Sequence, residues 1–313
     1  MTSRERVLCA VRHREPDRVP FNLRLTEAMV ERFRRETGLA DGDYAAHFGH
    51  DLRSVGLRLP ARPADVPRPE WSPKPEEQAV ADCAAKVRAL REQGLAVFNS
   101  YVCGVFEEAK FWLDDAAVLT LPYEDPGRLA GILDRITELK LLHYGAYARA
   151  GVDIVFMGDD LGAQSALIMS PEQYRQWYRP RHRRIIEHLR SINPDVLVAF
   201  HCCGHVTPLV PDLIELGVDI LEAVQPEAMD LAGLKREYGR HITFWGGIGN
   251  QSVLARLKPD AVVESVRRTL ALMAPGGGYL ASPCHTVTED IPWENVLAFH
   301  RAVGEFGGYR AGR

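Results

Sequence analysis

The chain has 313 residues, of which 46% are hydrophobic and 26% are charged, and its 38 basic and 42 acidic side chains give a formal net charge of −4. This composition is typical of a globular protein with a large buried core. It excludes the strongly basic surface expected of a nucleic-acid-binding protein, and the sequence has no apolar run long enough to cross a membrane. We expect a cytoplasmic protein, because the first residues lack the apolar stretch of a signal peptide and six cysteines are too few for a disulfide scaffold.

Short apolar runs alternate with amphipathic helical patterns along the chain. The pattern predicts a helix near residues 2–12, then helices over 76–93 and 125–149, and one that begins after Ser170. Ser170 is a good N-cap, Pro171 suits the first helical position, and Gln173 can close a capping box. The runs expected to form strands are 19–23, 52–59, 96–102, 153–157, 196–201, 219–224, 242–246 and 278–282.

Eight strands separated by helices predict a parallel sheet, because parallel neighbours need crossover connections. An open doubly wound sheet also fits this alternation, but the count of eight favours an α/β (β/α)₈ TIM barrel with an extra N-terminal helix. The proline-rich stretch 60–75 falls inside the second βα unit and is expected to be a rigid connection. We therefore predict a single barrel domain over residues 1–313.

The strongest chemical signal is the sequence His201-Cys-Cys-Gly-His205 at the end of an expected strand. Side chains alternate along a strand, so His201 and Cys203 should point the same way and Cys202 the opposite way. The carboxyl end of a barrel strand is also where active sites are built. The pair is therefore a candidate for metal binding, although an H-x-C sequence and buried cysteines also occur without a metal.

Two more candidate ligands follow later strands. Cys284 comes after the strand expected at 278–282, and Glu222 lies in the strand expected at 219–224. A histidine and two cysteines with an open fourth position are typical of a catalytic zinc site, and thiolates favour Zn²⁺ over other metals. Glu222 is the candidate for the fourth position, from which an incoming substrate thiolate would displace it.

Other polar side chains are expected at the same rim. Asp159 and Asp160 follow the strand expected at 153–157, and one of them could face the cavity and supply a proton while a loop or helix-capping role stays open. The candidates for substrate orientation are Asn99, Tyr101, Gln164 and Trp245. The glycines at 246–249 lack the spacing of a dinucleotide-binding fingerprint.

Taken together, these residues resemble the uroporphyrinogen decarboxylase superfamily over nearly the whole chain. The matching segments are Gly-Asp-Asp-Leu-Gly at 158–162, His-Cys-Cys-Gly at 201–204, Val-Gln-Pro at 224–226, Phe-Trp-Gly-Gly at 244–247 and Gly-Gly-Gly-Tyr at 276–279. The resemblance implies a (β/α)₈ barrel. The arginine-rich segment of the porphyrin decarboxylases is missing here, where Arg24 is the one cation that remains in 21–27.

The resemblance therefore points to the branch of zinc methyltransferases that work with corrinoid proteins, whose H-x-C and distant Cys match His201, Cys203 and Cys284. It implies methyl transfer between a small methylated substrate or thiol, such as coenzyme M, and the cobalt of a corrinoid carried on a separate partner protein, since the chain has no Asp-x-His-x-x-Gly segment. Two alternatives stay open: a metal-free decarboxylase of the same fold, and a zinc-binding barrel without catalytic activity.

Overall fold

A computed structural model describes residues 1–40, 42–71 and 73–309. It divides the chain into two compact units: a first unit of residues 1–53, 94–96 and 220–313, and a second unit of residues 54–93 and 97–219. The described residues contain eight strands, which are separated by helices except between β2 and β3, and all described pairings between these strands are parallel. The chain thus has the expected α/β fold of TIM-barrel type with an extra N-terminal helix. That residues 1–313 form one domain stays a prediction.

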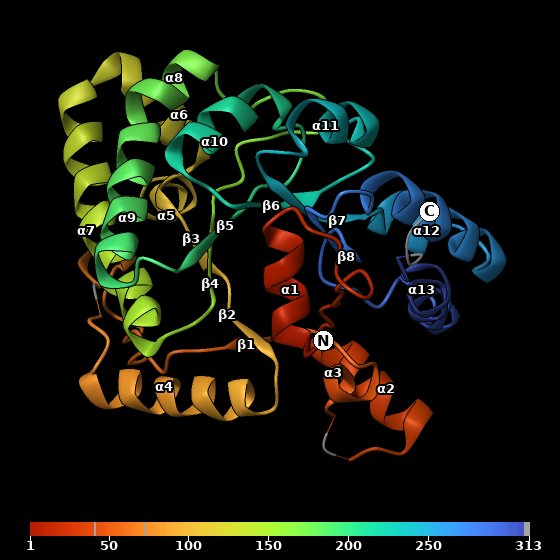
Figure 1. Cartoon of the computed structure of the whole chain (residues 1–313). Helices are drawn as coiled ribbons and strands as arrows, with labels where there is room; N and C mark the ends of the chain where they lie inside the picture. The colour runs from red at the N-terminus through yellow and green to blue at the C-terminus, as the bar shows by residue number, and fades with distance from the viewer. Residues whose placement is uncertain (41, 72, 310–313) are drawn as a thin grey trace. The chain divides into compact units, whose positions relative to one another are not determined.

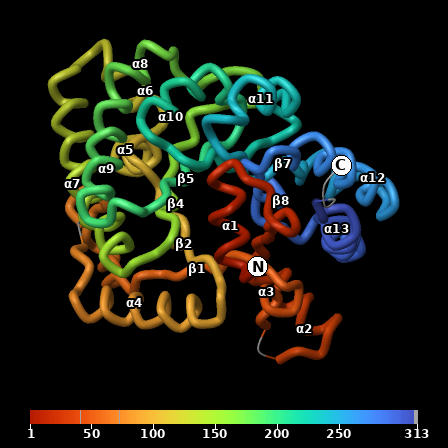
Figure 2. Tube along the Cα trace, in the orientation of Figure 1, coloured from red at the N-terminus to blue at the C-terminus, as the bar shows by residue number. Residues whose placement is uncertain are grey.

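The second unit carries the strands that precede the H-x-C sequence. Its helices are α4 (Glu77–Glu92), α5 (Val105–Trp112), α6 (Asp115–Glu124), α7 (Pro126–Ala150), α8 (Pro171–Trp177), α9 (Arg179–Ile192) and α10 (Val210–Leu216). Its strands are β3 (Val102–Cys103), β4 (Ile154–Gly158) and β5 (Leu197–His201), together with most of β2 (Ala96–Asn99). Strand β4 pairs with β2, β3 and β5, and α7 and α9 lie side by side (Figures 1 and 2).

The first unit carries the helices α1 (Ser3–Val11), α2 (Glu27–Thr37), α3 (Tyr44–His47), α11 (Leu231–Tyr238), α12 (Pro259–Met273) and α13 (Trp293–Phe306). Its strands are β6 (Ile220–Val224), β7 (Thr243–Ile248) and β8 (Tyr279–Pro283), and β1 (Leu52–Val55) begins in it. Strand β7 pairs with β6 and β8. Helix α1 ends at the amino ends of two strands, since Ala10 accepts a hydrogen bond from Gly278 and Val11 accepts one from Thr243.

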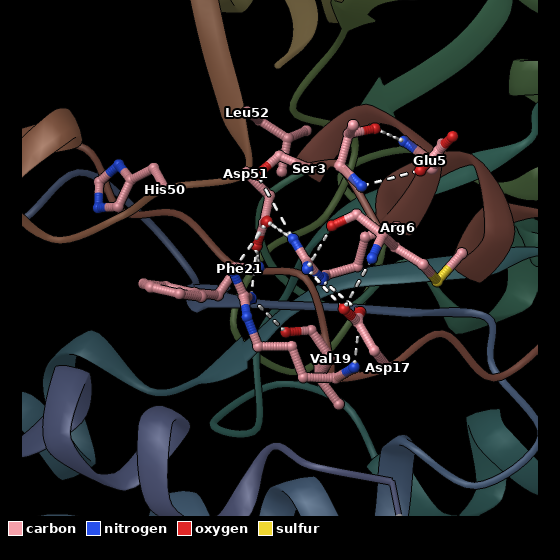
Figure 3. A network of polar contacts seen from close by, with 12 residues as sticks. Ser3, Glu5, Arg6, Asp17, Val19, Phe21, His50, Asp51 and Leu52 are labelled. Carbon is pink, nitrogen blue, oxygen red and sulfur yellow. Dashed lines mark hydrogen bonds and ion pairs between the residues drawn. The ribbon is translucent and has the colours of Figure 1, made fainter. Parts of the chain in front are cut away.

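Buried charges hold α1 in place within the first unit (Figure 3). The guanidinium of Arg6 contacts Asp17 at 2.6 Å and Asp51 at 2.7 Å, and Arg18 contacts Asp51 at 2.7 Å. Asp51 is fully buried and directly precedes β1. Two arginines and two carboxylates thus neutralise one another where the N-terminal helix meets the start of a strand.

The strand predicted at 19–23 is wrong. This segment makes an isolated bridge between Phe21 and Ala281 of β8, and the amide of Phe21 donates to the Asp51 carboxylate instead of to a neighbouring strand. The predicted strand 96–102 is interrupted and gives β2 and β3, which restores the count to eight. The connection 60–75 contains a short 3₁₀ turn, Arg68–Glu70, while Ser72 lies outside the described residues.

The predicted helix starts are close to the observed ones. Helix α1 begins after Thr2, whose side chain forms a capping box with Glu5, and α8 begins after Ser170, which accepts a hydrogen bond from the Gln173 amide. The side-chain oxygen of Gln173 has no partner among the described residues, so the second half of the capping box expected at α8 does not form.

Candidate metal centre

The register between β4 and β5 brings two chemically active loops together. Gly158, the last residue of β4, lies opposite His201, the last residue of β5. A side chain at position 158 would place its Cβ 2.3 Å from the carbonyl oxygen of His201, so glycine is required for this approach. The amide of Asp159 then donates to the same carbonyl. Two residues beyond the pair Gly158 and His201, Asp160 lies opposite Cys203.

Asp160, His201 and Cys203 form a cluster that could hold a metal ion. Their ligand atoms all lie within 4.8 Å of one another. The Sγ of Cys203 is 3.4 Å from Nε2 of His201, and that nitrogen is 3.5 Å from Oδ1 of Asp160. The same carboxylate oxygen accepts a 2.8 Å hydrogen bond from the amide of Cys203.

The donor set fits a zinc ion. Nitrogen, thiolate sulfur and carboxylate oxygen are its usual protein ligands, and three of them leave a coordination position free for a substrate. The imidazole of His201 is buried, whereas the side chain of Asp160 is 34% exposed, so the cluster is open on the carboxylate side. The sequence predicted His201 and Cys203 as ligands and named Asp160 as a proton donor, and it missed Asp160 as a candidate third ligand.

Cys202 points away from this cluster, as its position in the strand predicted. It is buried, and its Sγ accepts a hydrogen bond from the amide of Leu161. Gly204 allows the chain to turn immediately after Cys203: it has a φ of +78°, and a Cβ there would lie 2.5 Å from the carbonyl oxygen of Ala163. The loops after β4 and β5 therefore pack backbone against backbone, which fixes Asp160 relative to Cys203.

Asp159 has a different environment from its neighbour. It is fully buried and accepts hydrogen bonds from the amides of Val105 and Glu107, both at 2.9 Å. In addition, Oδ2 of Asp159 lies 2.8 Å from Nε2 of His182. Asp159 thus satisfies the free amides at the start of α5, as an N-cap does. The catalytic role predicted for it stays a prediction, and its contacts are those of a helix-capping residue.

Tyr101 and Glu107 border the cluster. The Tyr101 ring meets the His201 ring edge-on, with centroids 5.2 Å apart and planes at 74°. The Tyr101 hydroxyl donates to the Glu107 carboxylate, which lies in the first turn of α5. Burial raises the pKa of Glu107, the charges of Asp159 and Asp160 raise it further, and the hydrogen bond from Tyr101 lowers it. The sequence missed Glu107 because the strand predicted at 96–102 concealed where α5 begins.

Besides Tyr101, two other residues predicted to contact the substrate lie in the second unit, namely Asn99 and Gln164. Asn99 is buried and exchanges hydrogen bonds with the backbone of Phe156, accepting from its amide at 2.6 Å and donating to its carbonyl at 2.9 Å. Its amide therefore joins the end of β2 to β4. Gln164 is exposed in the turn between Ala163 and Ala166.

The remaining predicted site residues belong to the first unit. Glu222 is buried in β6 and forms an ion pair with Arg24, with Nη2 and Oε1 2.8 Å apart. Cys284 follows β8, and its Sγ donates to the carbonyl of Val224 at 3.0 Å. The indole of Trp245 is buried and donates to Asn22. That Glu222 and Cys284 join His201 and Cys203 at one metal ion stays a prediction.

None of the described helices is long and apolar enough to span a lipid bilayer. The fold is of the α/β barrel type, and the candidate metal ligands lie at the carboxyl ends of β4 and β5. Enzymes with this fold build their active sites at the carboxyl ends of the strands. Residues 74–306 match the family described as uroporphyrinogen decarboxylase (URO-D), and the chain belongs to this family. The superfamily expected from the sequence motifs is therefore confirmed.

Similar proteins in this family carry two different names. The chain is 26% identical over 182 residues to a methylated-thiol–coenzyme M methyltransferase of Methanosarcina mazei, covering 58% of this chain and 46% of that protein. It is 25% identical over 189 residues to a uroporphyrinogen decarboxylase of Methylococcus capsulatus, covering 60% and 52%. The chain thus spans about half the length of these curated relatives. A solved methyltransferase structure from Methanosarcina mazei has a TM-score of 0.72 at 19% identity, covering 98% of this chain and 99% of that one, which shows the shared fold.

Proposed function

We propose that this protein is a zinc-dependent methyltransferase. It moves a methyl group between a small methylated substrate or a thiol, such as coenzyme M, and the cobalt of a corrinoid carried by a separate protein. The observation that carries the proposal is the convergence of one nitrogen, one sulfur and one oxygen donor from His201, Cys203 and Asp160. The similarity to a methyltransferase that uses coenzyme M supports it.

The residues of the second unit would hold the metal ion from one side. His201 supplies Nε2, Cys203 supplies its thiolate, and Asp160 supplies a carboxylate oxygen that solvent reaches. We propose Cys284 as a second thiolate. We propose Glu222 as the fourth ligand predicted from the sequence, although its Oε1 forms an ion pair with Arg24. A bound zinc ion supplies Lewis acidity, which lowers the pKa of a thiol or polarises the heteroatom that carries the methyl group.

The other side chains orient the substrate. Tyr101 is 41% exposed beside His201 and offers an aromatic edge to a small molecule, and Gln164 extends from the adjacent turn. Asn99 is buried and holds the end of β2 to β4, close in the sequence to Tyr101, and we propose Trp245 as a further substrate contact from the first unit. We propose a cytoplasmic location, because all six cysteines are free and the proposed ligands require reduced thiols.

Metal-free decarboxylation is the second candidate, because relatives of this chain are uroporphyrinogen decarboxylases. That chemistry needs cations to bind the carboxylates of the substrate. Arg24, the cation that the sequence offers for this role, pairs with Glu222 instead. The ion pair therefore favours the methyltransferase.

Metal analysis and a methyl-transfer assay test the proposal together. The purified chain should contain about one zinc per molecule, and it should transfer methyl groups from at least one member of a panel of methyl ethers, methylamines and thioethers to a Co(I) corrinoid. Cys284→Ser should remove most of the zinc while the fold is retained. A zinc content below about 0.2 equivalents in folded wild-type protein would favour the decarboxylase.

A further inference from the structure

Glu107 and Tyr101 form a polar pair beside the candidate metal centre, and neither residue is one of the proposed metal ligands. The hydroxyl of Tyr101 donates to Oε2 of Glu107 and lies 3.4 Å from the carbonyl oxygen of Gly158. The ring of the same tyrosine rests against His201. Tyr101 therefore connects the Glu107 carboxylate to the imidazole of the metal centre through one side chain.

The position of Glu107 is fixed by the backbone. Its amide donates to Asp159, which also binds Val105 and His182 and is fully buried. The first turn of α5 is thereby held against the end of β4, and Glu107 projects from that turn. Its side chain is half-buried, so it is neither sealed in the core nor free in solvent.

The chemistry of the proposed reaction requires a proton carrier. A thiol that binds a metal ion loses its proton, and a heteroatom that loses a methyl group becomes more basic. The two carboxylates predicted from the sequence for this role have other contacts: Asp159 caps α5 and Asp160 lies among the candidate ligands. Glu107 is the half-buried carboxylate that remains beside the cluster.

We propose that Glu107 carries the proton of the heteroatom that occupies the open position of the metal centre, with Tyr101 orienting its carboxylate. This inference rests on the proposed function. In the direction of thiol methylation, the S–H bond breaks, the electron pair stays on the sulfur, and the proton forms an O–H bond with a carboxylate oxygen of Glu107. In the direction of demethylation, the protonated Glu107 returns that proton to the departing heteroatom.

The charges around Glu107 suit this role. Asp159 and Asp160 from the end of β4 raise its pKa, as does burial, while Tyr101 before β3 and His201 at the end of β5 lower it. Burial, the largest of these effects, sets the direction, so the pKa of Glu107 is raised and its carboxylate binds a proton more readily than an exposed glutamate does.

Counting protons on thiol binding tests the proposal. The full chain is loaded with Co²⁺ in place of zinc and titrated with 2-mercaptoethanol, by calorimetry in two buffers of different ionisation enthalpy. Wild-type protein should keep the thiol proton and release close to none to the buffer. Glu107→Gln keeps an oxygen for the Tyr101 hydroxyl but cannot take up a proton, and it should release about one proton per thiol bound.

Two further variants test how the carboxylate is oriented and which carboxylate takes part. Tyr101→Phe keeps the ring against His201 but removes the hydroxyl that orients Glu107, so its proton release should lie between those of wild type and Glu107→Gln. Glu124→Gln removes an exposed carboxylate at the end of α6 and should behave as wild type. The cobalt absorption spectrum before thiol addition should be the same in all four proteins, which shows that the metal site is intact.

Each outcome decides a different point. Equal proton release by wild type and Glu107→Gln overturns the role of Glu107 and leaves the metal site standing. Proton release by Tyr101→Phe as low as in wild type overturns the orienting role of the tyrosine hydroxyl. If the sulfur-to-cobalt absorption of Co²⁺-loaded wild type does not increase when the thiol is added, this proposal and the proposed function both fail.

Discussion

His50 should make the stability of this protein strongly dependent on pH. It is 2% exposed, packs against the rings of Phe21, Tyr44 and Phe48, and its Nε2 has no hydrogen-bond partner among the described residues. Burial lowers the pKa of His50 to about 3, and the positive charge of Arg53 adds to the effect. The native protein therefore keeps this imidazole neutral, whereas the unfolded chain protonates it near its ordinary pKa of 6.5.

The size of the effect follows from the difference between the two pKa values. Below pH 6.5 the unfolded state binds one more proton than the native state, so the free energy of unfolding falls by about 1.4 kcal/mol for each pH unit until His50 titrates in the native protein near pH 3. The contribution is fully present above pH 6.5 and lost as the pH falls to about 3. Over the whole range the loss amounts to roughly 5 kcal/mol, and over two pH units to roughly 2.7 kcal/mol.

Urea unfolding measures this contribution. Wild type and His50→Phe are compared at pH 7 and at two pH units below the normal histidine pKa. Phenylalanine fits the surrounding aromatic cluster and cannot titrate, so the variant should lose about 2–3 kcal/mol less stability than wild type between the two conditions. His47→Phe, at an exposed position three residues earlier, is the matched control for the exchange of a histidine for a phenylalanine. Parallel pH profiles for wild type and His50→Phe would refute the reasoning.

Three further predictions concern five substitutions. Arg6→Met removes a buried partner of two carboxylates and should lower the free energy of unfolding by about 3 kcal/mol in a urea titration. Cys203→Ser should lower zinc affinity at least about tenfold by metal analysis, whereas Cys202→Ser should keep the metal. Asp159→Asn should lower the melting temperature and leave the zinc content unchanged, because the contacts of Asp159 hold α5. Asp160→Asn should lower the zinc content and leave the melting temperature unchanged. Equal zinc loss in both aspartate variants would contradict these assignments.

Local sequence signals predicted the elements that are stabilised locally. The capping box of Thr2 and Glu5 and the N-cap Ser170 satisfy the amides of their own helices, so a few neighbouring residues determine where α1 and α8 begin. The segment 19–23 has the composition of a strand, but Phe21 donates its amide to Asp51, thirty residues away in the sequence. No pattern within the segment records that contact.

In the candidate site too, the sequence predicted the features that depend on neighbouring residues and missed those that depend on distant contacts. Strand alternation separated Cys202 from His201 and Cys203, because it depends on one strand only. Asp160 as a third ligand depends on the register between β4 and β5, which pairs Gly158 with His201 and is not readable from either strand alone. The position of Glu107 depends in addition on where β3 ends, and no local pattern in residues 96–104 marks that end.

The adjacent carboxylates after β4 explain how one short segment can both build and support a metal centre. Because successive side chains leave an extended backbone in opposite directions, Asp159 points to the start of α5 and to His182, and Asp160 points to Cys203. A register shift of one residue between β4 and β5 would exchange these environments, exposing the capping carboxylate and burying the candidate ligand. Gly158 permits the observed register, because a Cβ at this position would lie 2.3 Å from the carbonyl oxygen of His201. The proposed metal centre therefore depends on the glycine before the two aspartates as well as on the candidate ligands.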